Sequence, residues 1–209
     1  NVCVNVCVCV CVCVCVCRTS PSPLISSYKF SQVFVARQVP TLEQLLRGVA
    51  GRCHLLLELK SKQFGLVSST VAALNQCGWL DAQSMPYEKG GVTVFCQDLD
   101  QLDEVGQLAP HAARMLAVSQ IDAQAVRLAQ AHKLQGLSTS AAHENLAEQV
   151  AIAKAAGLRC RTAGIGAPDD TGLANLQRAI EAGADGTTID WPFKAKDVIQ
   201  MMTTRGNTH

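Results

Sequence analysis

The sequence has few aromatic residues, few charged residues and almost no net charge. Of its 209 residues, 4% are aromatic and 17% are charged, and the formal net charge is +1. This balance lacks the basic surface by which proteins bind nucleic acid or anionic membranes. Residues 1–17 form the one long apolar run, and it lacks the basic residues that open a secretory signal. We therefore expect a soluble body with no nucleic-acid partner and no membrane span.

Residues that build familiar catalytic groups are scarce in the first part of the chain. All five histidines lie at or after His54, and no aspartate precedes Asp81. No spacing typical of a Ser-His-Asp triad or of a His-x-x-x-His metal motif occurs. Three histidines in helix or loop contexts are expected to be surface residues rather than catalysts: His111, His132 and His143.

Most of the cysteines belong to a low-complexity segment. Seven of the eleven lie in residues 1–17, where Val and Cys alternate almost without exception. The favoured interpretation is a translated simple repeat; a row of metal-binding thiolates and a weak signal-like segment are the alternatives. The other four have no Cys-x-x-Cys spacing and are expected to be reduced, buried thiols: Cys53, Cys77, Cys96 and Cys160.

The segment after the repeat contains Ser-Pro-Ser-Pro and little apolar pattern, so residues 18–32 are predicted to be a linker. No folded structure is expected before about Val33. We predict one domain over residues 33–203 and a short tail over residues 204–209, because a chain of this length is large enough to bury one core without disulfides.

The domain is predicted to alternate between strands and helices. Helices are expected from about Pro40 to Gly51 and over residues 65–75, 98–108, 122–132, 144–156, 171–182 and 194–202. Strands are expected around residues 55–58 and over residues 91–96, 114–119, 134–139, 158–162 and 185–190. Such alternation with short loops indicates a parallel sheet. A closed eight-stranded barrel needs about 250 residues, so some strands of a barrel are missing.

A pair of charged residues follows the first predicted strand. Leu55, Leu56 and Leu57 form the continuous apolar run of a strand covered on both faces, and Glu58 and Lys60 then share one side of the strand. The carboxyl ends of strands in parallel α/β folds are where active sites gather. The pair is therefore a candidate for metal or phosphate chemistry, and an ordinary ion pair facing solvent is the alternative.

Polar or aromatic side chains also lie at the ends of two further predicted strands. Trp191, after the last strand, is a candidate wall of a substrate pocket or a residue of the core or rim. Asp185 is expected to be a turn or strand-entry residue. Arg161 and the glycines that follow it could hold a phosphate, but the segment fits no complete phosphate-loop motif. A flexible connection with a solvated arginine is the favoured interpretation.

Two motifs together resemble the glycerophosphodiester phosphodiesterase family. They are Val-Pro-Thr-Leu-Glu at residues 39–43 followed by Leu-Glu-Leu-Lys at residues 57–60, and Gly-Ala-Asp-Gly-Thr-Thr-Ile-Asp-Trp-Pro at residues 183–192. The resemblance implies a TIM barrel that hydrolyses a glycerophosphodiester to an alcohol and glycerol phosphate. It implies that Glu58 ligates a divalent cation, Ca²⁺ or Mg²⁺, and that Lys60 lies beside the substrate phosphate. Trp191 would then contact substrate.

The chain also departs from that family. The family's His-Arg-Gly segment, its Glu-x-Asp pair of metal ligands and its His-Asp motif precede Pro-Thr-Leu, and here no His or Asp precedes it. We therefore expect an α/β, TIM-barrel (β/α)8-like fold that lacks roughly the first three strands. We expect little hydrolysis, because a lone carboxylate cannot hold a hard dication against water.

Other interpretations of the body remain open. One is a non-catalytic, degenerate barrel that binds a phosphate ester or a protein partner. Another is an unrelated barrel enzyme acting on a sugar phosphate, for which the sequence offers no strong candidate base. An incomplete sheet would expose an edge strand, so self-association through that edge is also expected.

Overall fold

The computed structural model describes residues 40–50, 54–80 and 91–206. The Val-Cys repeat, the predicted linker and Cys53 lie outside these residues. None of the described helices combines the length and the apolar character needed to cross a membrane.

The predicted alternation of helices and strands is confirmed. The strands are β1 (Leu55–Glu58), β2 (Val92–Cys96), β3 (Ala113–Ala117), β4 (Gly136–Ser140), β5 (Arg159–Ala163) and β6 (Gly186–Thr187). The helices are α1 (Leu42–Val49), α2 (Leu66–Gln76), α3 (Leu99–Leu108), α4 (Ala123–Ala131), α5 (Leu146–Ala155), α6 (Asp170–Glu181) and α7 (Pro192–Gly206). Helix α7 therefore starts earlier than predicted and extends into the expected tail.

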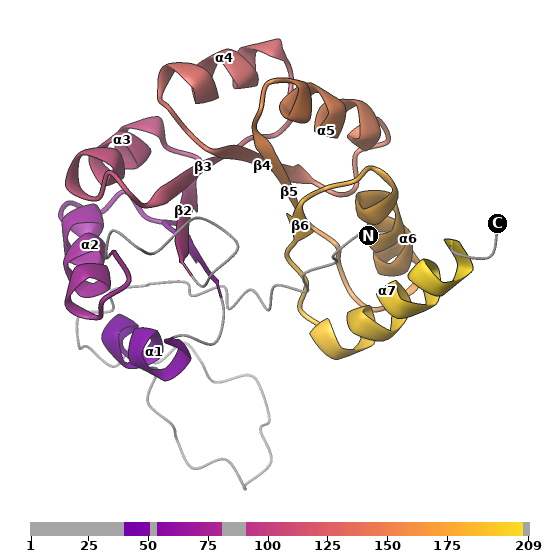
Figure 1. The fold of residues 1–209 in the computed structure, drawn as a ribbon, viewed down its shortest axis with the longest axis horizontal. Helices are drawn as coiled ribbons and strands as arrows, with labels where there is room; N and C mark the ends of the chain where they lie inside the picture. The colour runs from indigo at the N-terminus through magenta and orange to yellow at the C-terminus, as the bar shows by residue number, and fades with distance from the viewer. Residues whose placement is uncertain (1–39, 51–53, 81–90, 207–209) are drawn as a thin grey trace, which may run out of the picture.

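The six strands form one parallel sheet in the order β1-β2-β3-β4-β5-β6. Each strand thus pairs with the next along the chain, as in a barrel, whereas a doubly wound sheet reverses its strand order. Figure 1 shows the sheet curled into an arc with helices along its outer side. The fold is therefore an α/β half-barrel, consistent with part of a TIM barrel.

Capping side chains fix the starts of several helices. Thr41 accepts a hydrogen bond from the Gln44 amide, and the Gln44 side chain accepts one from the Thr41 amide, which forms a capping box. Asp98, Asp122 and Asp169 accept hydrogen bonds from backbone amides in the first turns of α3, α4 and α6. These side chains satisfy backbone amides that the first turn of a helix leaves without a partner.

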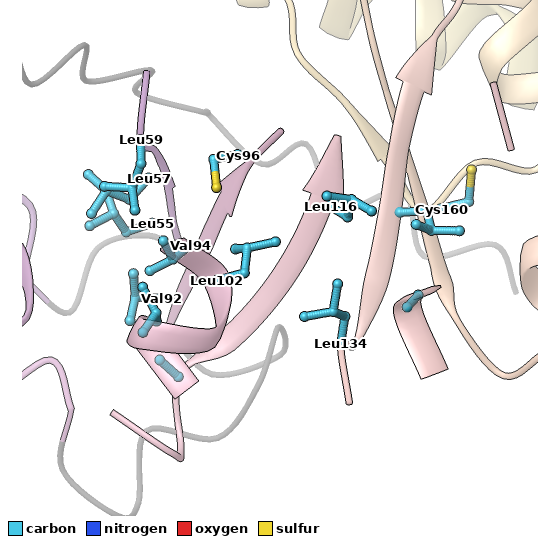
Figure 2. Packing of buried hydrophobic residues seen from close by; sticks show 14 of the residues in the cluster. Leu55, Leu57, Leu59, Val92, Val94, Cys96, Leu102, Leu116, Leu134 and Cys160 are labelled. Atoms are coloured by element: carbon cyan, nitrogen blue, oxygen red, sulfur yellow. The ribbon is translucent and has the colours of Figure 1, made fainter. Parts of the chain in front are cut away.

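The main core lies between the helices and the outer side of the sheet. Leu55, Leu57 and Leu59 alternate toward it from β1 and the residue just beyond, and all are at most 4% exposed. Figure 2 shows these three side chains near Val92 and Val94 of β2. The residues between them face the other way, as the two-residue period of a strand requires.

The inner side of the arc carries a smaller apolar cluster. Leu56, Phe95 and Met115 pack together there, from three adjacent strands. Gly136 of β4 is the register partner of both Met115 and Arg159, so Arg159 of β5 also faces inward. A Cβ on Gly136 would lie 2.6 Å from Met115 Cε, which shows how closely the inner side chains cross the sheet at this glycine.

The last strand is shorter than predicted. Residues 185–190 were expected to be a strand, and β6 contains Gly186 and Thr187 alone. Asp185, directly before β6, also bonds to β5, because its Oδ2 accepts a hydrogen bond from the Cys160 amide at 2.8 Å. The prediction that Asp185 stands at the entry of the strand is confirmed. After Ile189 the chain turns into α7, with Pro192 as its first residue, where a proline loses no helical hydrogen bond.

Candidate functional site

The predicted pair Glu58 and Lys60 lies at the carboxyl end of β1. Glu58 pairs in register with Phe95, a member of the inner cluster, so its side chain starts from the inner side of the sheet. Lys60 Nζ lies 3.4 Å from Glu58 Oε2, and the two side chains are 54% and 27% exposed. The prediction that the two share one side of the strand is confirmed. Ion pairs this exposed contribute about 0–1 kcal/mol, so the contact adds little stability.

The segment that carries Lys60 is held by the start of α3. Lys62 Nζ lies 2.5 Å from Asp98 Oδ2, and Gln101 Nε2 donates to the Ser61 carbonyl at 2.8 Å. The hydrogen bond with Lys62 lowers the pKa of Asp98, and the same bond raises the pKa of Lys62. No local sequence pattern predicts these contacts, because the partners are 36 or more residues apart in the chain.

A divalent cation does not fit the described residues by themselves. Ca²⁺ takes six to eight oxygen ligands, and Mg²⁺ requires near-octahedral oxygen coordination. Among residues 40–50, 54–80 and 91–206, no three His, Cys, Asp or Glu side chains come close enough to share a metal ion. The Glu58 carboxylate instead has an ammonium as its neighbour. The described residues alone therefore support no metal-dependent step.

A groove of about 340 Å³ lies elsewhere on the molecule. It runs between α2 and the connection from α3 to β3, with Val71 and Leu108 among its apolar residues and Asn75 and His111 among its polar ones. None of the predicted site residues lines this groove. The polar side chains at the carboxyl end of β1 are the better candidate site.

Trp191 joins the end of β6 to the loop after β5. Its indole Nε1 donates to the Gly166 carbonyl at 2.7 Å, and the ring packs against the main core. The side chain is neither fully buried nor freely exposed. Trp191 thus has a structural contact of its own, and its predicted contact with substrate stays a prediction.

No family model matches the chain, and no curated protein is similar to it. Solved structures do match. A glycerophosphodiester phosphodiesterase from Parabacteroides distasonis has a TM-score of 0.62 and 17% identity, covering 78% of this chain and 65% of that chain. A phosphodiesterase from Oleispira antarctica, in complex with the product sn-glycerol-3-phosphate, has a TM-score of 0.60 and 24% identity, covering 77% of this chain and 61% of that chain. The described residues share their fold with part of these glycerophosphodiester phosphodiesterases.

We call this fold the phosphodiesterase fold. The glycerophosphodiester phosphodiesterase from Agrobacterium tumefaciens shares it with a TM-score of 0.54 and 18% identity, covering 74% of this chain and 59% of that chain. The chain thus spans between 59% and 65% of the length of these three structures. At these identities the likeness concerns the backbone arrangement, and it assigns no role to individual side chains.

Arg161 of this chain is buried on β5 and does not lie in a flexible connection. It is 2% exposed, and its Nη2 donates to the Thr187 carbonyl at 3.4 Å. Its register partner is Gly186, where a Cβ would lie 2.5 Å from Arg161 Nη1. The expectation of a solvated arginine is therefore wrong. The missing side chain of Gly186 makes the space in which the guanidinium lies.

A buried histidine also lies near the inner side of the sheet. His54 directly precedes β1 and is 8% exposed, and its Nε2 lies 2.8 Å from Thr93 Oγ1 of β2. Burial, followed by the charges of Arg161 and Arg159, lowers the pKa of His54 from 6.5 to about 4. The sequence predicts no role for His54, and its position directly before the run of buried leucines is the one feature that could have indicated its burial.

Two of the three histidines predicted to be surface residues make hydrogen bonds in the structure. His132 Nδ1 lies 2.7 Å from Asp103 Oδ2, between α4 and α3. His143 Nε2 lies 2.6 Å from the Ser119 carbonyl and joins the loops after β4 and β3. His111 is exposed. The surface position of His111 is confirmed, whereas His132 and His143 are both partly buried.

Replacing Trp191 with phenylalanine is expected to destabilise the protein by about 1 kcal/mol, the usual net contribution of one hydrogen bond. The phenyl ring keeps most of the packing against the core, but it cannot donate to the Gly166 carbonyl. Equilibrium unfolding in urea, followed by circular dichroism, measures the difference. A Trp191→Phe variant as stable as the native chain would show that this bond does not fix the end of β6.

Proposed function

We propose that this chain is part of a glycerophosphodiester phosphodiesterase-like barrel and that it does not hydrolyse diesters as it stands. The shared fold and the two sequence motifs support the relationship. The described residues form six parallel strands, two fewer than a closed TIM barrel has.

The environment of Glu58 supports the proposal that the chain does not hydrolyse diesters. A single carboxylate whose nearest cation is a lysine lacks the additional oxygen ligands that a hard dication needs. Hydrolysis also needs a group that protonates the departing alkoxide, most often a histidine. No histidine precedes His54 in the sequence, and His54 itself is buried and bonded to Thr93.

The purified chain is expected to show no measurable turnover of a glycerophosphodiester in the presence of Ca²⁺ or Mg²⁺. Release of glycerol phosphate, followed with a coupled assay, measures this directly. The matched control is Glu58→Gln, which keeps the shape of the side chain and removes its charge. Turnover in the native chain at rates ordinary for enzymes, about 1 per second or more, together with its loss in Glu58→Gln, would overturn the proposal.

The second candidate function is phosphate-ester binding without turnover. Lys60 favours it, because its side chain is 54% exposed beside a strand end and can approach a ligand without first being uncovered. Glycerol phosphate is the probe, since the Oleispira antarctica structure holds sn-glycerol-3-phosphate. A charge-assisted hydrogen bond from Lys60 would contribute about 1.5–3 kcal/mol.

Lys60→Ala is therefore expected to weaken glycerol phosphate binding by at least about tenfold. Isothermal titration calorimetry of native and variant chains measures the affinities. Arg127→Ala is the control, because Arg127 is an exposed cation on α4, on the outer side of the half-barrel. Equal weakening by both variants would indicate non-specific attraction of the anion, and no binding by the native chain would rule this function out.

A further inference from the structure

The segment of residues 59–64 leaves the carboxyl end of β1 directly after Glu58. At its start, Leu59 is 4% exposed, and its amide donates to the Phe95 carbonyl at 3.0 Å. The next residue, Lys60, extends toward solvent. The backbone on the amino side of Lys60 is therefore fixed by β2 and the main core.

Two contacts from the start of α3 hold the segment on the other side of Lys60, one at the Ser61 backbone and one at the Lys62 side chain. Gln101 Nε2 donates to the Ser61 carbonyl at 2.8 Å, and Asp98 Oδ2 lies 2.5 Å from Lys62 Nζ. Asp98 does two things at once, because its Oδ1 also caps α3 by accepting from the Gln101 amide at 3.2 Å. The two contacts thus come from the cap and the third residue of one helix.

We propose that Asp98 and Gln101 are positioning residues that hold the backbone around Lys60 so that its ammonium can bind a phosphate ester. The inference rests on the proposed phosphate-ester binding. A lysine loses rotamer freedom when it binds a ligand, and a fixed backbone means that the chain itself adds no further ordering cost. Asp98 and Gln101 act through Ser61 and Lys62, and neither needs to touch the ligand.

The substitution Asp98→Asn separates the two roles of Asp98. Asparagine caps a helix about as well as aspartate, so α3 keeps its start. The negative charge that faces Lys62 is lost. Gln101→Ala removes the contact with Ser61 by a different route, which gives an independent second variant. Asp122→Asn is the matched control, because Asp122 caps α4 by accepting from the Ala125 amide at 2.8 Å, and no lysine bonds to it among the described contacts.

In calorimetry with glycerol phosphate, Asp98→Asn and Gln101→Ala are each expected to weaken binding about threefold to tenfold, with unchanged melting temperatures. Asp122→Asn should bind like the native chain. The double variant Asp98→Asn with Lys62→Gln should bind no more weakly than Asp98→Asn alone, because both substitutions break the same contact. Native affinity in both Asp98→Asn and Gln101→Ala would overturn the inference.

Hydrogen exchange without ligand separates this inference from the proposed function. Peptides that cover residues 59–64 should exchange faster in Asp98→Asn and in Gln101→Ala than in the native chain, and peptides from α3 should not. Unchanged exchange in both variants overturns the inference, whatever the chain binds. Faster exchange with unchanged affinity also overturns it. If the native chain binds no glycerol phosphate, the proposed binding fails first, and the positioning role fails with it.

Discussion

Replacing Gly172 with alanine is expected to destabilise the protein by about 3 kcal/mol, the upper end of the usual cost of overpacking. Gly172 lies in the first turn of α6, and its amide donates to Asp169 Oδ1 at 3.0 Å. A Cβ at this position would lie 1.7 Å from the Ala167 carbonyl oxygen and 3.3 Å from that of Ile165. Both are backbone atoms, so no side chain can rotate away. The connection between β5 and α6 has to move instead.

That connection also carries Gly166, the residue to which Trp191 bonds. The substitution is therefore expected to loosen the end of β6 as well as the start of α6. Equilibrium unfolding in urea measures the loss of stability, and Gly48→Ala is the matched control. Gly48 lies in α1 with nothing within 4 Å of an added Cβ, so alanine there should be neutral or stabilising by up to about 1 kcal/mol. A Gly172→Ala variant as stable as Gly48→Ala would contradict the expected clash.

Most of the fold could be predicted because its signals are local. The run Leu55 to Leu57 indicated a strand covered on both faces, and the structure buries all three residues at 3% exposure or less. The alternation of such runs with helical patterns predicted that the strands are parallel and joined by helical crossovers. All five observed strand pairs are parallel. The strand predicted over residues 134–139 is β4, which starts two residues later than predicted. Its residues Ser138 and Thr139 are polar yet buried, so its apolar pattern is weaker than that of β1.

Contacts between distant residues could not be predicted from local patterns. An arginine at a strand end is usually solvated, and this expectation failed for Arg161 because Gly186 of the neighbouring strand leaves space for the guanidinium. The register of β5 and β6 decides that pairing, and the sequence alone does not specify it. Likewise the two-residue spacing of Glu58 and Lys60 predicted their shared side, but the contact of Lys62 with Asp98 depends on where α3 starts.

His54 shows how these distant contacts set the chemistry of one side chain. It lies at the start of β1, bonded to Thr93 of β2, and the charges of Arg159 and Arg161 from β5 act on it. An added proton on the buried ring would lose its hydration and face two cations. His54 therefore stays neutral in the folded chain to about pH 4, whereas in the unfolded chain it binds a proton near its ordinary pKa of 6.5.

The folded chain is expected to lose about 2.5 kcal/mol of stability through His54 between pH 7.5 and pH 4.5. The folded pKa lies below the unfolded one, so the unfolded state binds more protons in this window. The contribution is complete above pH 6.5 and is lost progressively as the pH falls toward 4. His54→Gln cannot titrate, and its stability should therefore fall less over the same interval. Urea unfolding at both pH values gives the two differences, which also contain the effect of every other titrating group. Subtracting one from the other isolates His54, and equal losses in the two chains would show that the ring is already accessible to protons in the folded state.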